Sequence, residues 1–442
     1  MNQDYQSLLE QAQAARTQAD WLSLVQCLQQ LTTGEKVSSW ALLELEQVLD
    51  LAIEVLQLGD FQERWDIAKV LSKLGESAVA PLIEILEDEE AEELRWFASR
   101  ILGDLAAPEA IAALIEVLKT AQSEELSGMA AAALGNIGTP AVDALAKLLA
   151  HEDTRLLAVR TLSYIRSQAT IAPLLDVVQD SQVAIRAAAI EALSSFHDPR
   201  IPPILLNALD DVAATVRREA VIGLSFRSDL REELALVARL SPRLHDFNLE
   251  VCCACAIGLG RLGTDTASDV LYQVLVSAHT PVNLQIEIIR ALGWIGTATS
   301  LEYLTSYLNQ QSSVTLAEEI VAVLGRVKST STSSIAQTLI ELLNSDHPIT
   351  QSARVKSTIA LSLSQLGDLQ AVEPLIQLLA AEPAVRLHAI AALKKLAPEI
   401  ARQRLEQLAT GELAPELKQG VTIALAEWSL TEAGGYSTQE SF

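Results

Sequence analysis

Aromatic residues are scarce in this chain: they make up 4% of its 442 residues, although half of the residues are hydrophobic. We therefore expect a core of leucine, isoleucine, valine and alanine. Four cysteines are too few for a secreted disulfide framework. No apolar run approaches the roughly 18 residues of a membrane span, and the N-terminus MNQDYQSLLEQAQ has no apolar signal segment. These absences predict a cytoplasmic protein without membrane insertion.

Basic residues are also few, with 32 lysines and arginines against 57 acidic residues. The formal net charge is −25 and the pI is near 4.6. Such a surface repels phosphate groups, so we expect no nucleic-acid partner. Binding to anionic lipid is disfavoured for the same reason.

The chain does contain a repeat, and residues 173–196 show it most clearly. This stretch reads as an apolar-periodic helix, a polar turn at residues 180–182 and an alanine-rich helix. A leucine near the end of each alanine-rich helix, here called the counting leucine, recurs at steps of 28 to 39 residues: Leu71, Leu102, Leu134, Leu162, Leu193, Leu224, Leu259, Leu292, Leu324, Leu363, Leu393 and Leu425. The pattern predicts an all-α solenoid, a right-handed superhelix of about twelve helix pairs.

The alanine-rich helix is here the first helix of each unit, and the helix after it is the second. Glycine or serine usually follows the counting leucine, as at Gly103 and Gly325, and we expect this small residue to let the two helices approach closely. Gly75, Gly138, Gly263 and Gly296 are predicted to end first helices. Pro81, Pro173 and Pro374 are predicted to lie in the first turn of second helices.

Three segments are predicted along the chain. Residues 1–60 form an N-terminal helical cap, with helices at residues 8–19, 21–31 and 40–58. Residues 61–430 form the repeat array. Residues 431–442 are expected to be a disordered tail.

A basic residue lies seven positions before the counting leucine in eight of the twelve units. The set is Arg64, Arg95, Arg155, Arg186, Arg217, Lys356, Arg386 and Lys418. One interpretation is a ladder that binds a ligand. The other, which we favour, is a repeated arginine–aspartate link between units, with acids such as Asp180 and Asp210 in the turns.

Residues 78–86, 131–145 and 183–193 resemble HEAT repeats, and more narrowly the phycobilin-lyase-type HEAT-like repeats of cyanobacteria. The resemblance covers residues 60–430 and implies that second helices line a concave face where partners bind. It also implies, as an alternative, a function as a phycobilin lyase or lyase-related chaperone, with a phycobiliprotein or a second HEAT-like subunit as partner. No catalytic residue of a lyase can be placed on this chain. HEAT-repeat hydroxylases carry several His-Glu pairs, whereas this chain has one, at residues 151–152.

Cys252, Cys253 and Cys255 suggest another alternative, a thiol-based carrier of a metal or an iron–sulfur cluster. Cys252 and Cys255 are three residues apart and share a helical face. Cys255, however, occupies a position that is alanine in other units, as at Ala98, Ala130, Ala158, Ala189 and Ala220, which indicates a small buried packing residue. The spacing offers no complete ligand set, so we expect no metal and no cofactor.

The second helices carry one polar residue in an otherwise apolar pattern, which predicts a polar stripe on the wall that partners contact. Acidic residues are concentrated in residues 76–125, which contain thirteen acidic and three basic residues. We therefore expect a non-enzymatic scaffold or adaptor whose acidic end receives a basic segment of a protein partner. The predicted partner-binding residues are Glu84, Glu87, Glu116, Asp176 and Glu341.

Overall fold

The computed structural model describes residues 2–33, 42–87, 92–328 and 332–434. Its regular structure in these ranges is helical, without a strand, as the sequence predicts. The chain forms two compact units, Met1–Ala208 (unit 1) and Leu209–Phe442 (unit 2). Across the described ranges, no helix is both long and apolar enough to cross a bilayer.

Each counting leucine falls in a helix of its own, and eleven of the twelve are fully buried. Leu425, the last, is only half-buried because it lies in the final helix. These helices form the alanine-rich row: α4 (Phe61–Leu74), α6 (Glu92–Asp104), α8 (Glu124–Ile137), α10 (Glu152–Tyr164), α12 (Val183–Leu193), α14 (Ala214–Ser225), α16 (Leu249–Leu262), α18 (Val282–Ile295), α20 (Val314–Gly325), α22 (Ala353–Leu366), α24 (Pro383–Leu396) and α26 (Pro415–Gly434).

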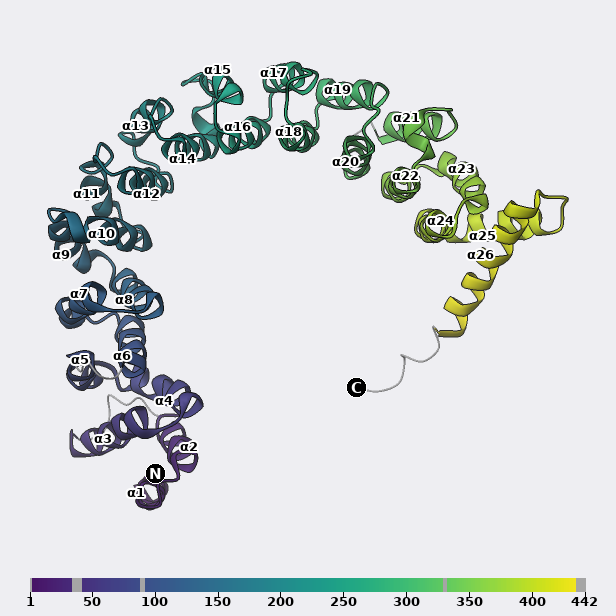
Figure 1. Ribbon diagram of the computed structural model, residues 1–442. Coiled ribbons are helices and arrows are strands. Elements are labelled where there is room, and N and C mark those ends of the chain that lie inside the picture. Colours follow the sequence, from purple (N-terminus) through teal and green to yellow (C-terminus); the bar gives the residue numbers. More distant parts are fainter. Residues whose placement is uncertain (1, 34–41, 88–91, 329–331, 435–442) are drawn as a thin grey trace. The chain divides into compact units, whose positions relative to one another are not determined.

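A second helix follows each alanine-rich helix except α26. The second-helix row is α5 (Val79–Glu87), α7 (Ile111–Thr120), α9 (Val142–Leu148), α11 (Ile171–Leu175), α13 (Ile201–Ala208), α15 (Leu236–Leu240), α17 (Asp265–Leu275), α19 (Ala298–Leu308), α21 (Thr332–Leu343), α23 (Val372–Gln377) and α25 (Pro398–Ala409). Successive alanine-rich helices pack on one another from α4 to α12 in unit 1 and from α14 to α24 in unit 2. Figure 1 shows the two rows side by side in each unit.

The two ends differ slightly from the sequence-based prediction. Three helices precede the array: α1 (Asn2–Thr17), α2 (Trp21–Leu31) and α3 (Leu42–Leu58). Helix α2 packs on α4, and the capping role of residues 1–60 stays a prediction. Helix α26 runs to Gly434, four residues into the segment expected to be disordered, and residues 435–442 lie outside the described residues.

The curvature of unit 2, taken by itself, corrects one expectation. Its alanine-rich helices α16, α18, α20, α22 and α24 lie on the inner side of the curve, and the second helices lie on the outer side (Figure 1). The expectation that second helices line the concave face is therefore wrong for unit 2. Glu341, on α21, consequently belongs to the outer row of this unit.

The glycine after the counting leucine marks a close helix–helix contact, although not the expected one. A Cβ added at Gly103 would lie 2.7 Å from the Cα of Ala133, in the next alanine-rich helix. One added at Gly325 would lie 2.5 Å from the Cβ of Ser362, again in the next alanine-rich helix. The small residue thus serves the stacking of successive units rather than the pairing of helices within one unit.

The predicted ends of the helices are confirmed. Gly75, Gly138, Gly263 and Gly296 each follow an alanine-rich helix with φ between 62° and 78°, the left-handed region that favours glycine. Pro81 is the third residue of α5, where the missing N–H leaves no helical hydrogen bond unmade.

The basic ladder ties neighbouring repeats together through backbone and side-chain contacts. In α10, Arg155 Nε donates to the carbonyl oxygen of Leu149 at 2.6 Å, at the end of the preceding second helix. Its Nη1 donates to Asp180 Oδ2 at 2.7 Å, in the turn before α12. Arg186, the expected partner of Asp180, donates to the backbone oxygens of Asp180 and Ser181. The carboxylate therefore links to the arginine of the preceding unit.

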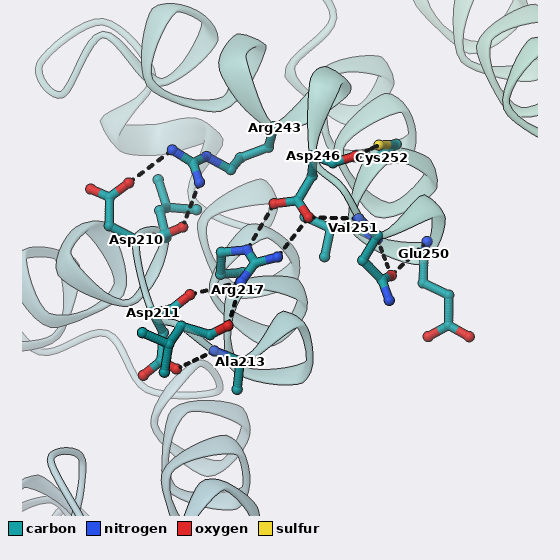
Figure 2. Close-up of polar contacts among 12 residues, drawn as sticks. Asp210, Asp211, Ala213, Arg217, Arg243, Asp246, Glu250, Val251 and Cys252 are labelled. Atoms are coloured by element: carbon teal, nitrogen blue, oxygen red, sulfur yellow. Dashed lines mark hydrogen bonds and ion pairs between the residues drawn. The ribbon is translucent and has the colours of Figure 1, made fainter. Parts of the chain in front are cut away.

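The most buried link of this kind joins α14 to the turn before α16 (Figure 2). Arg217 donates from Nε and Nη2 to the two oxygens of Asp246, at 2.7 and 2.6 Å. The side chains are 12% and 4% exposed. The backbone N–H of Asn248 donates to the same carboxylate, and Arg217 above all holds the pKa of Asp246 below its ordinary value.

Gly103→Ala is expected to lower the free energy of unfolding by about 1–2 kcal/mol, because overpacking against Ala133 outweighs the gain in helix propensity. Gly128→Ala in neighbouring α8 is the control, since nothing lies within 4 Å of a Cβ added there. This variant is expected to be as stable as the parent or more stable by up to about 1 kcal/mol. Urea unfolding measures both, and equal stability of the two variants would show that the helix contact is not tight.

Asp246→Asn is expected to destabilise unit 2 by about 3 kcal/mol at pH 7, because Arg217 keeps its charge and loses the carboxylate that accepts from its Nε and Nη2. Since the folded-state pKa of Asp246 is lowered, its contribution is complete above the ordinary pKa near 3.8 and is lost as the pH falls through the folded-state value. The difference between the variant and the parent should therefore shrink below pH 4. Asp210→Asn is the control: this carboxylate pairs with Arg243 but is 78% exposed, so its removal should cost under about 1 kcal/mol. Urea titrations across this pH range measure both, and a pH-independent difference for Asp246→Asn would contradict the account.

Candidate functional site

Two of the predicted acidic residues line one groove in unit 1, between the second helices α5 and α7. The groove has a volume of about 420 Å³. Glu87 and Glu116 line it and are exposed, together with Glu109. Glu84 is exposed on the same helix as Glu87 without lining the groove. Asp88, Glu89 and Glu90, which the sequence adds to this acidic end, lie outside the described residues.

The only arginine that lines this groove is already engaged in the structure. Arg95 is 6% exposed; its Nε donates to the carbonyl oxygen of Leu86 at 3.1 Å and its Nη2 donates to Thr120 Oγ1 at 3.2 Å. It therefore holds α5 and α7 in place. Lys119 pairs with Glu116 at 2.8 Å, an exposed pair of small energetic value. The groove thus presents negative charge to the solvent.

Asp176 lies in a similar groove of unit 1, between α9 and α11. This groove has a volume of about 530 Å³, and Arg155 and Asp180 line it with Asp176. Asp176 is exposed, whereas Asp180 is engaged by Arg155. The two grooves of unit 1 thus share one arrangement. In each, an arginine donates to a backbone carbonyl oxygen, and at least one exposed carboxylate lines the groove beside it.

Glu341 stands apart from the other predicted residues, in unit 2. It is exposed on α21 and accepts a hydrogen bond from Gln337 Nε2 at 2.8 Å. It lines none of the grooves described here. The structure thus brings Glu87 and Glu116 together, keeps Glu84 on the same helix, and places Asp176 and Glu341 elsewhere.

The cysteine cluster has the properties of packing residues rather than of metal ligands. Cys255 is fully buried and its thiol donates to the carbonyl oxygen of Leu240 at 3.0 Å. The Cys252 thiol donates to the carbonyl oxygen of Asp246 at 3.2 Å. Burial raises the pKa of all three thiols, that of Cys253 to about 11. Metal binding requires the thiolate, which these surroundings disfavour. Within the described ranges, no three His, Cys, Asp or Glu side chains are grouped to hold a metal ion.

The sequence-based search missed a group of aromatic side chains on α4 and α6. Phe61, Trp65, Trp96 and Phe97 contact one another with ring centroids 5.1 to 6.4 Å apart. The guanidinium carbon of Arg100 lies 3.6 Å from the ring centroid of Trp65. A signal was available, since Trp65 and Trp96 both stand six residues before their counting leucine and aromatics are rare in this chain.

Comparison with solved structures identifies the fold. The chain matches Kap95 in a Kap95:Nup1 complex with a TM-score of 0.55 and 15% identity, over 90% of this chain and 64% of that one. It matches Kap95p bound to RanGDP with a TM-score of 0.52 and 14% identity, over 98% of this chain and 66% of that one. A structure of importin beta matches with a TM-score of 0.51 and 12% identity, over 98% and 78%. This chain thus spans just under two thirds of the two Kap95 chains.

Comparison of the sequence with curated proteins gives no match. The sequence pattern of HEAT repeats matches residues 79–155, 150–225, 237–324 and 336–426, which together make up most of the chain. These residues are the stacked helix pairs of both units. The chain therefore belongs to the HEAT-repeat family.

Proposed function

We propose that this protein is a non-enzymatic scaffold that binds a protein partner through unit 1. The observation that carries the proposal is the groove between α5 and α7, where Glu87 and Glu116 are exposed while Arg95 is held by backbone and threonine oxygens. Solved proteins of similar fold were captured in complexes with proteins, Kap95 with Nup1 and with RanGDP. Their low identity supports the fold, and the partner class is our inference.

The charge of this region favours a basic segment as the partner's contact. Residues 76–125 carry a net charge of −10, two-fifths of the whole chain's −25. Attraction between such a surface and a basic segment acts mainly on the association rate. It is screened over about 8 Å at physiological salt, so that the rate should depend on ionic strength.

The narrower resemblance to phycobilin-lyase-type repeats stays a prediction. The family match identifies the repeat and does not identify a lyase. The absorption spectrum of the purified protein separates these functions. A bilin band would favour the lyase or chaperone, a brown visible shoulder a cluster carrier, and a bare ultraviolet protein peak the scaffold.

The scaffold predicts a specific effect of reversing charge at the groove. Glu84→Lys, Glu87→Lys and Glu116→Lys combined should slow association with the partner and flatten its salt dependence, while helix content stays unchanged. The measurement is affinity capture from the source cells with the tagged parent. Association rates of each captured protein, purified, are then compared at low and high salt.

A matched control combines Glu302→Lys, Glu399→Lys and Glu416→Lys. It changes the net charge by the same amount, at residues far in sequence from those of the groove. These glutamates are exposed on α19, α25 and α26 of unit 2. The control should bind the partner at the parental rate. Equal rates for the groove variant, the control and the parent at both salt concentrations would contradict a partner site in this groove.

A further inference from the structure

We propose that unit 1 carries a second docking surface, on its alanine-rich row, for an extended basic segment of a partner protein. The surface, here called the aromatic ledge, consists of an apolar row on α4, α6 and α10 and a carboxylate row on α6, α8 and α10. The proposal rests on the proposed scaffold function, because it assumes that the chain binds proteins. It concerns other residues on the other row of helices.

The apolar row begins with the aromatic group and occupies one register of the repeat. Trp65, Trp96, Gly128 and Leu156 each stand six residues before the counting leucine of α4, α6, α8 and α10. Both tryptophans are partly exposed, and Phe61, one turn before Trp65, is 58% exposed. Packing between α4 and α6 alone gives no reason to leave Phe61 in the solvent.

The row is interrupted at Gly128, which has no side chain. Gly128 is exposed on α8, and a Cβ added there would meet no atom within 4 Å. Trp96 precedes this position in the row and Leu156 follows it. An apolar side chain of a partner would find open space at this position of the row.

Arg100 makes the tryptophans a fixed platform. Its guanidinium carbon lies 3.6 Å from the Trp65 ring centroid and 5.9 Å from that of Trp96, within the range of cation–π attraction. Rings held in this way lose little conformational freedom when a partner binds, and buried aromatic anchors dominate the energy of many interfaces.

The carboxylate row lies one helical turn before the apolar row. The first turns of α6, α8 and α10 carry two acids each, Glu92 and Glu93, Glu124 and Glu125, and Glu152 and Asp153. Residues three and four apart share a helix face, so each pair lies beside Trp96, Gly128 or Leu156 of its own helix.

Favourable placement at helix N-termini does not account for these acids. The first turns of α12, α14, α18, α20, α22 and α24 have the same dipole and carry no acid. Three of the six acids have partners in the structure: Arg64 pairs with Glu93, the backbone N–H of Gln122 donates to Glu92, and Gln182 Nε2 donates to Glu152. In the described part of the chain no cation pairs with the other three, Glu124, Glu125 and Asp153. Charge complementarity therefore points to a basic occupant.

The spacing of the row favours an extended occupant. Packed helices lie about 8–10 Å apart, so the acid pairs of α6, α8 and α10 recur at that interval. An extended polyproline-type chain rises about 3.1 Å per residue, which places every third side chain about 9 Å apart on one face. Aromatic surfaces bind such proline-containing segments well because these segments are already extended. The occupant is thus a basic segment with lysine or arginine at every third position.

The test uses a fluorescein-labelled 13-residue peptide with lysine at every third position and proline and leucine between, and fluorescence anisotropy with the full chain. The parent should bind it, and the same peptide with glutamate in place of lysine should not bind. Phe61→Ser with Trp96→Ser should weaken binding by about tenfold or more. Phe226→Ser with Trp294→Ser is the matched control, because these unit 2 residues are 59% and 60% exposed, and it should bind as the parent does.

Glu124→Gln with Glu125→Gln keeps the proposal testable if the aromatic variant fails to fold, since both carboxylates are exposed and neither pairs with another side chain in the described ranges. This pair should weaken binding at low salt and match the parent at high salt. The Glu84, Glu87 and Glu116 lysine variant should keep peptide binding, which separates this surface from the α5–α7 groove. Parental affinity of both ledge variants, loss of binding in the groove variant alone, or tighter binding of a helical peptide with lysine at every seventh position would each overturn the proposal.

Discussion

The close contact between successive alanine-rich helices is the constraint on which the rest of the structure depends. Gly103 meets Ala133 and Gly325 meets Ser362 at distances that leave no room for a Cβ. Such contacts fix each repeat against its neighbour, and the counting leucines beside them are buried in every unit but the last. The basic ladder adds hydrogen bonds from its arginines to backbone carbonyl oxygens near the ends of helices. Arg155 and Arg217 also pair with an aspartate in the turn that follows their unit.

This stacking also decides what the molecule can offer a partner. Because each repeat contacts only its neighbours, equivalent positions form rows across several helices, and a row becomes functional when its side chains depart from the common pattern. In unit 1 the second-helix row differs from the common pattern at Glu87 and Glu116, which are exposed carboxylates. The alanine-rich row differs from it at Trp65 and Trp96. Both departures fall in the repeats where acidic residues are densest.

Much of the fold could be predicted from the sequence, because the same type of residue recurs at the equivalent contact in many repeats. Counting leucines, helix-ending glycines and the second-helix prolines follow from local rules. The partner of the glycine could not be predicted, since periodicity does not say which neighbouring helix a small residue faces. Asp246 was missed because the ladder position of its own unit is Cys252, which cannot pair with a carboxylate. Its partner is Arg217 of the preceding unit, 29 residues earlier. The ring contacts of Trp65 and Trp96 likewise required the stacking of α4 on α6.

The central claim is that stability comes from contacts between adjacent repeats. Deleting residues 260–292 removes one complete repeat of 33 residues from unit 2 and joins Leu259 to Gly293 in the same register. Circular dichroism with urea unfolding of this shortened chain tests the claim most directly. The account predicts unchanged helicity per residue and a cooperative transition, because Gly293 can still pack on Val323. Loss of helicity or of cooperative unfolding would contradict it.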